Sequence, residues 1–147
     1  YETPPLEENL YFGGLPRLHV NVNTATVGGQ IYALLEDCDG ANCIHIGHAI
    51  MDLRYHAGGD DEQTWTPVFE EITALMEFFP MDVEVPAGHT IKLTLRSTGE
   101  DYLPSAASTL VTVVDAGSTL QLDTFDPETR EYYETVMCTA QICKDNL

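Results

Sequence analysis

Apolar and polar residues alternate along most of this chain with the two-residue period that is typical of half-buried β-strands. The alternation is clearest in residues 18–22 and 90–96, where every second residue is apolar. The apolar spacing typical of amphipathic helices is nearly absent, so the pattern predicts an all-β protein. The residues expected to point inward in these two segments are Leu18, Val20, Val22, Ile91, Leu93 and Leu95.

Turn residues divide the alternating pattern into about eight strands. Pro80 indicates an edge or a break in one of them, and residues 116–118 are expected to form a turn between two others. Besides residues 18–22 and 90–96, the expected strands are residues 30–36, 44–55, 71–85, 109–115 and 119–124, and residues 130–138 could form a strand or a short helix. Short turns between so many strands predict one antiparallel β-sandwich, most simply a jelly roll.

The apolar positions change parity inside residues 44–55. Even-numbered positions are apolar at the beginning of this segment, and odd-numbered positions are apolar from Met51 onwards. A β-bulge shifts side chains from one face to the other, so we expect a bulge near residues 47–50. His45 and His48 are three residues apart on this strand and are therefore expected on opposite faces, which argues against a zinc pair.

The length and the proline positions suggest how the chain is divided. A chain of 147 residues is expected to form a single domain. Two adjacent prolines predict that residues 1–13 form an extended N-terminal arm. Residues 14–126 are assigned to the sandwich, and residues 127–147 to a C-terminal tail with its own cysteine pair.

The chain is strongly acidic, with 24 Asp and Glu against 6 Lys and Arg, and therefore has a formal net charge of −18. Nucleic acids and anionic membrane surfaces are poor partners for such a chain, because binding to them depends on basic residues. No run of 18 apolar residues is present to span a bilayer. The charge favours a salty or extracellular setting.

Four cysteines form two local pairs, Cys38 with Cys43 and Cys138 with Cys143. Four cysteines allow three connectivities, but each four-residue spacer suits a tight disulfide loop, whereas the Cys-x-x-Cys spacing of zinc and redox sites is absent. Two local disulfides predict an oxidising compartment and a secreted protein. Reduced, buried cysteines are the alternative.

Candidate chemical groups are few. The Gly-x-Ser-x-Gly turn of a serine nucleophile is absent, so we expect no catalysis from this chain alone. Asp37, Asp39 and Asp60 are candidate ligands for a structural calcium ion, although the glutamate of an EF-hand is missing, and no other cofactor is expected. Trp65 or Tyr102 could provide an aromatic platform for a sugar. His89 is expected to make a structural hydrogen bond.

Several motifs together resemble the C-terminal domain of the X-Pro dipeptidyl-peptidase and cocaine esterase family of serine hydrolases. The resemblance extends from about residue 4 to residue 122, and its most specific elements are an Asp-Gly loop, a Leu-Arg-Tyr segment and a Pro-Ala-Gly-His turn. The motifs are Leu34-Leu-Glu-Asp-Cys-Asp-Gly40, Ile46-Gly-His-Ala-Ile-Met-Asp-Leu-Arg-Tyr55, Met76-Glu-Phe-Phe-Pro80, Val85-Pro-Ala-Gly-His89 and Ile91-Lys-Leu-Thr-Leu95.

The resemblance implies a jelly roll shaped like galactose-binding modules, which packs on an α/β-hydrolase domain that carries the catalytic residues. It therefore predicts a non-catalytic scaffold or interaction module, whose partners are that catalytic domain or other copies of the chain. The cysteine pairs are not features of this family. They and the extended arm favour a first alternative, a subunit of an extracellular homopolymeric filament assembled by strand or arm exchange. A carbohydrate-binding module is the second alternative.

Overall fold

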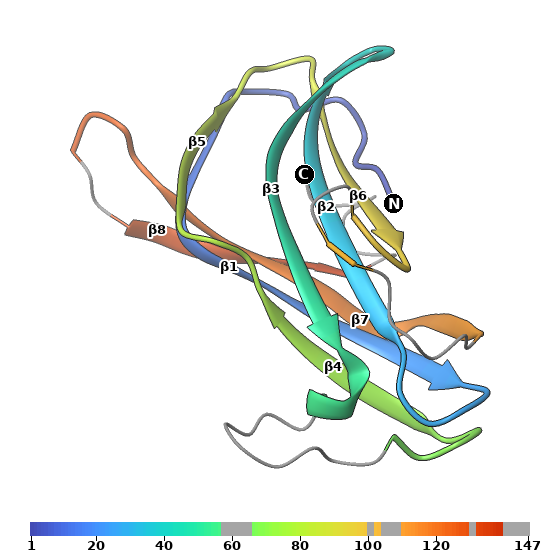
Figure 1. Cartoon of the computed structure of the whole chain (residues 1–147). Helices are drawn as coiled ribbons and strands as arrows, with labels where there is room; N and C mark the ends of the chain where they lie inside the picture. Colours follow the sequence, from blue (N-terminus) through green and yellow to red (C-terminus); the bar gives the residue numbers. More distant parts are fainter. Residues whose placement is uncertain (57–65, 100–101, 104–109, 130–131, 140–147) are drawn as a thin grey trace.

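The structure of the protein is a computed structural model that describes residues 1–56, 66–99, 102–103 and 110–129, and the backbone of residues 132–139. Eight strands in this part of the chain form two antiparallel sheets (Figure 1). The expected all-β antiparallel sandwich is therefore confirmed. The strands are β1 (Leu10–Thr24), β2 (Gln30–Asp39), β3 (Asn42–Asp52), β4 (Glu71–Glu77), β5 (Met81–Val85), β6 (Thr90–Arg96), β7 (Val111–Phe125) and β8 (Tyr132–Thr139).

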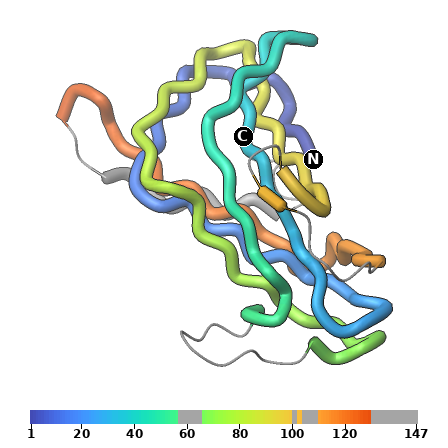
Figure 2. The backbone as a smooth tube through the Cα atoms, viewed as in Figure 1, coloured from blue at the N-terminus to red at the C-terminus, as the bar shows by residue number. Residues whose placement is uncertain are grey.

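Strand β1 organises the larger, five-stranded sheet. This strand of 15 residues pairs with β5 and then β4 along one edge and with β7 along the other, and β7 pairs in turn with β8. Pro80 lies in the break between β4 and β5, as the sequence predicts. The smaller sheet has the order β3-β2-β6, and the chain passes repeatedly from one sheet to the other (Figure 2).

The inward faces of the two sheets enclose one hydrophobic core. Phe12 and Phe78 are among its largest fully buried side chains. Leu95 is partly buried and packs against this core, and the other five residues predicted to point inward are buried in it. The inward positions inferred from alternation in residues 18–22 and 90–96 are therefore confirmed. The buried members of the two segments are Leu18, Val20, Val22, Ile91 and Leu93.

The turn expected at residues 116–118 does not separate two strands, and that prediction was wrong. Val114 is aligned with Asn21 of β1, and Thr119 is aligned with His19 of the same strand. Both halves of β7 therefore continue along one partner strand, and residues 115–118 loop out between them.

Polar contacts with Asn21 hold this loop in place. The Asn21 amide side chain donates to the Ala116 carbonyl oxygen at 2.9 Å, and the Asn21 backbone N–H donates to Ser118 Oγ at 3.0 Å. Gly117 has a φ of +79°, a conformation that glycine adopts readily. Residues 116–118, which have turn-like preferences, therefore form part of a bulge inside one strand.

Strand β3 is shorter than expected because it ends at Asp52, and a 3₁₀ turn, η1 (Leu53–Tyr55), follows. Its bulge lies at Ile46, because Gly47 is aligned with Leu35 of β2 whereas His45 is aligned with Glu36. The change of parity therefore occurs one residue before the predicted window.

The beginning of the N-terminal arm lies along the outer edge of β6. The backbone N–H of Leu93 donates to the Tyr1 carbonyl at 2.9 Å, and the Thr3 N–H donates to the Ile91 carbonyl at 3.0 Å. The Tyr1 hydroxyl donates to the Asp115 carboxylate on β7. Partial burial and this hydrogen bond raise the pKa of Tyr1 to about 12. The arm thus fastens the smaller sheet to the looped-out part of the larger one.

The burial pattern predicts that Phe12→Ala will lower the free energy of unfolding by about 3–5 kcal/mol, because it leaves a cavity between the sheets. Ile44→Ala is the control and should change stability by less than about 0.5 kcal/mol, because Ile44 is 66% exposed. Denaturant titrations of both variants measure the difference. Equal losses would contradict the assigned core.

Candidate functional site

One end of the sandwich exposes a group of apolar side chains, which we call the apolar tip: Val27, Val68, Phe69 and Leu110. Phe69 is 79% exposed and Leu110 is 70% exposed. The tip lies at the end where β1 turns into β2, opposite the β2–β3 hairpin (Figures 1 and 2). Large apolar side chains at this level of exposure are candidates for contact with another protein.

Backbone pairing with the end of β1 brings the tip residues together from distant parts of the chain. The Phe69 N–H donates to the Thr24 carbonyl at 2.9 Å, and the Ala25 N–H donates to the Leu110 carbonyl at 3.1 Å. Val68 and Thr24 also form a parallel bridge. The segments before β4 and before β7 therefore lie on opposite sides of the peptide group that joins Thr24, the last residue of β1, to Ala25.

Phe69 has a φ of +60°. Among the described residues, Phe69 is the one non-glycine residue whose φ angle lies in the left-handed region. For a bulky side chain this conformation is an outlier and costs on the order of 1–3 kcal/mol. The local backbone therefore presents a large aromatic ring to solvent in spite of a conformational cost.

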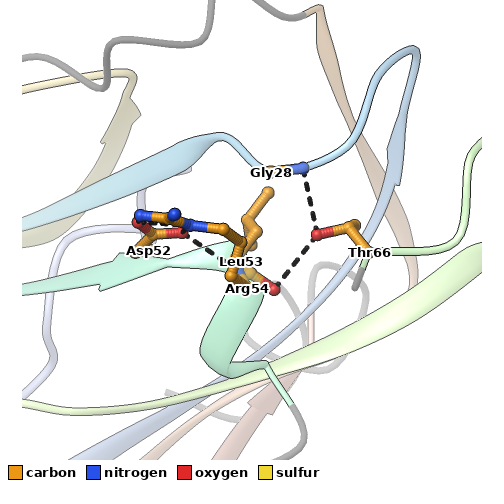
Figure 3. Close-up of polar contacts among 5 residues, drawn as sticks. All are labelled: Gly28, Asp52, Leu53, Arg54 and Thr66. Atoms are coloured by element: carbon orange, nitrogen blue, oxygen red, sulfur yellow. Dashed lines mark hydrogen bonds and ion pairs between the residues drawn. The ribbon is translucent and has the colours of Figure 1, made fainter. Parts of the chain in front are cut away.

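A buried threonine links the segments that carry the tip residues, and its contacts are shown in Figure 3. Thr66 Oγ1 accepts a hydrogen bond from the Gly28 N–H at 3.2 Å and donates to the Leu53 carbonyl at 3.4 Å. The Leu53 N–H donates in turn to the Gly29 carbonyl at 2.8 Å. The hydroxyl of Thr66 thus joins the β1–β2 turn, the 3₁₀ turn and the segment that leads to Phe69.

An ion pair orders the 3₁₀ turn beside Thr66. Asp52 caps this turn, because its Oδ1 accepts from the Arg54 backbone N–H at 3.0 Å, and its Oδ2 lies 2.5 Å from Arg54 Nη2. The hydrogen bonds from the Arg54 side chain are the largest cause that holds the pKa of the Asp52 carboxyl below its usual range. The Leu-Arg-Tyr segment of the sequence therefore has a structural role.

The tip is uncharged although the chain as a whole is strongly acidic. Residues 24–31, 66–69 and 110–114 contain no Asp, Glu, Lys or Arg, and Glu70 and Glu71 border the tip. Sequence reasoning missed this surface. The three uncharged segments are visible in the sequence, but only the pairing with β1 shows that they meet.

A second group of side chains gathers around His48 on the outer face of the smaller sheet, and we call it the aromatic–histidine cluster: Tyr32, His45, His48, Phe79 and Tyr102. The Tyr32 and His48 rings are stacked with centroids 5.6 Å apart, and Phe79 meets His48 edge-on at 5.4 Å. His48 Nε2 lies 3.0 Å from the Tyr102 hydroxyl oxygen. Tyr102, predicted as part of a sugar platform, is therefore engaged with a histidine.

His45 and His48 lie on one face, so the expectation of opposite faces was wrong. The extra residue, Ile46, adds one position between them and restores the same parity. Their ring nitrogens, His45 Nε2 and His48 Nδ1, are 3.3 Å apart. The bulge inferred from the apolar pattern is therefore the cause of the misplacement.

The candidate calcium ligands are not brought together in the described part of the chain. The Asp37 carboxylate is buried and lies 2.7 Å from His89 Nδ1, while Asp39 is exposed at the end of β2 and Asp60 lies outside the described residues. Among the residues that the structure describes, no group of three or more His, Cys, Asp or Glu could hold a metal ion. The hydrogen bond predicted for His89 is present.

The structure contains the predicted disulfide between Cys38 and Cys43, which closes the β2–β3 hairpin. The pairing of Cys138 with Cys143 stays a prediction, because both side chains lie outside the described part of the chain. Trp65 also lies outside the described residues. Within the described residues, no helix is long and apolar enough to cross a membrane.

The protein family described as the X-Pro dipeptidyl-peptidase C-terminal non-catalytic domain matches residues 1–134 of this chain. Among curated proteins, none matches the chain.

Solved structures share the fold at low sequence identity. An aminopeptidase from a marine sediment Thaumarchaeota archaeon matches with a TM-score of 0.74 and 13% identity over 86% of this chain. An α-amino acid ester hydrolase matches with a TM-score of 0.66 and 16% identity over 94% of the chain. A hydrolase of the CocE/NonD family from Staphylococcus aureus matches with a TM-score of 0.60 and 10% identity over 66% of the chain. The matched parts are 25%, 25% and 22% of those proteins, respectively.

The buried hydroxyl predicts the effect of Thr66→Val, which keeps the side-chain shape but leaves the Gly28 N–H without its acceptor. The free energy of unfolding should fall by about 1–3 kcal/mol. Thr66→Ser keeps the hydroxyl and should lose less. Denaturant titration measures the stability, and a larger loss for Thr66→Ser would contradict the bracing role.

The lowered pKa of Asp52 predicts a pH-dependent effect of Asp52→Asn. The ionised carboxylate stabilises the fold above its ordinary pKa of 3.8, and this stabilisation is lost as the pH falls through the lower value of the folded state. The stability difference between wild type and variant should therefore be largest above about pH 5 and should shrink in strong acid. Parallel thermal unfolding across pH measures it, with Asp39→Asn as an exposed control. A difference that does not vary with pH would refute the role of the charge.

Proposed function

This chain belongs to the family of X-Pro dipeptidyl-peptidase C-terminal non-catalytic domains, and we propose that it is the accessory β-sandwich of a longer serine hydrolase. In this proposal, the apolar tip docks on an α/β-hydrolase domain that carries the catalytic residues. The sandwich thereby holds that domain and helps to wall its substrate site. The observation that carries the proposal is the family match over residues 1–134.

The lengths of the structural neighbours support a catalytic partner. This chain corresponds to about a quarter of each, and their names describe an aminopeptidase, an ester hydrolase and a CocE/NonD-family hydrolase. The family itself is described as non-catalytic. Both facts favour a domain that acts through a neighbouring catalytic domain.

The chemistry of the tip supports its choice as the docking surface. Charged residues are depleted at the centres of protein interfaces, where aromatic residues are enriched, and the tip combines no charge with an exposed phenylalanine. Complete burial of Phe69 or Leu110 would be worth about 1.5–3 kcal/mol for each side chain. Four of the ten large apolar residues that the described part of the chain exposes are in the tip.

In the accessory role, the N-terminal arm belongs to its own sandwich. Tyr1 and Thr3 make their backbone hydrogen bonds with β6 of the same chain. The Cys38–Cys43 disulfide supports a further part of the proposal, namely that the protein works in an oxidising, extracellular compartment.

The test uses the complete gene product that contains this chain, and its coding sequence should include an α/β-hydrolase domain. Phe69→Gly removes the exposed ring and relieves the strain of the positive φ, so it should leave the sandwich as stable as before or more stable. It should nevertheless lower hydrolase activity and make the junction between the domains more sensitive to limited proteolysis. Activity is measured on ester and X-Pro anilide substrates.

Leu75→Thr is the matched control, because Leu75 is 48% exposed on β4 away from the tip. It should leave activity and proteolysis unchanged. A coding sequence without a hydrolase domain would overturn the proposed function. Equal behaviour of Phe69→Gly and wild type would overturn the tip as the docking surface.

A further inference from the structure

The histidine pair of the aromatic–histidine cluster brings two ring nitrogens face to face. His45 Nε2 and His48 Nδ1 are 3.3 Å apart, and they form a hydrogen bond when one of the two nitrogens carries a proton. Two imidazole nitrogens that bind one tetrahedral metal ion, each at about 2.0–2.1 Å, are about 3.3–3.4 Å apart. The separation thus equals that of two ligands on a shared ion.

We propose that His45 and His48 form a two-histidine site for a divalent first-row transition-metal ion such as Cu²⁺ or Zn²⁺. This site is independent of the apolar tip and of the proposed hydrolase partner. Imidazole suits these ions, whereas Ca²⁺ and Mg²⁺ prefer oxygen ligands. Since the described residues supply no third His, Cys, Asp or Glu to the group, water completes the coordination.

Tyr102 would set the tautomer that binding requires. A metal-binding histidine commonly donates its second ring N–H to a neighbouring group, which fixes the ring and raises its basicity. The Tyr102 hydroxyl oxygen lies 3.0 Å from His48 Nε2 and can accept that hydrogen. His48 Nδ1 then carries a lone pair toward His45.

The neighbours of His48 hold its ring in a fixed orientation. Tyr32 stacks on it, and Phe79 and Tyr102 approach it edge-on. Tyr102 is itself held, because Thr98 Oγ1 donates to its carbonyl at 2.9 Å. A preorganised ligand loses little conformational entropy on binding. His45 is exposed, so water and an ion can reach the pair.

The charges around the pair are compatible with a bound cation. Glu36 is aligned with His45 across the β2–β3 pair. Lys92 Nζ lies 3.9 Å from Glu36 Oε2, and Arg96 is aligned with Tyr32 on the same sheet. The net charge of −18 raises the local concentration of cations around the whole chain.

Calorimetric titration of the wild-type chain with Cu²⁺ and with Zn²⁺ tests the proposal. We expect binding to one dominant site, and at least a tenfold loss of affinity in His45→Gln and in His48→Gln. Tyr102→Phe should weaken binding by about tenfold or more, because it removes the group that orients His48. His19→Gln is the matched control, since it removes a histidine from the other sheet, and it should bind like wild type.

Two further measurements separate a metal site from a structural role. Thermal unfolding without metal should show that each variant is folded, and added Cu²⁺ should raise the unfolding temperature of wild type more than that of His48→Gln. The electron paramagnetic resonance spectrum of the Cu²⁺ complex should show two imidazole nitrogens. Unchanged affinity in the His45 and His48 variants, or an equal loss in His19→Gln, would overturn the proposal.

Discussion

Every strand of this sandwich must keep one face toward the shared core, and the other features of the fold follow from that constraint. A strict two-residue period satisfies it in β6, where Ile91 and Leu93 are buried. Strand β1 also keeps one face toward the core, and it pairs with other strands along both of its edges. Its backbone therefore holds the five-stranded sheet together. Where the partner strands do not match in length, the extra residues have to leave the ladder as bulges.

Two of the register shifts determine which polar groups meet on the outer surface. Ile46 is the extra residue of β3, and it places His45 and His48 on the same outer face. The loop at residues 115–118 is the extra length of β7, and it brings Asp115 within hydrogen-bonding distance of the Tyr1 hydroxyl. Chemistry on the outer surface therefore depends on how the core-facing pattern is interrupted.

The sequence was sufficient for the features that local patterns determine. Alternation predicted β6 with its observed bounds, and the spacing of Cys38 and Cys43 predicted their disulfide. A change of parity also indicated the bulge of β3. The sequence could not show which strands pair over long distances. Residues 116–118, for example, have the same local preferences in a hairpin turn and in a bulge. Only their common partner, β1, distinguishes the two.

The apolar tip was hidden from the sequence for the same reason, since Phe69 and Leu110 meet only through Thr24 and Ala25. The position of the apolar tip also limits how this acidic domain can associate with another protein. A net charge of −18 repels other copies of the chain and any acidic neighbour. The uncharged side chains of the tip reduce that repulsion locally, and burial of an aromatic ring there supplies an attraction that salt does not screen. A partner that docks at the tip is therefore recognised by shape and apolar contact.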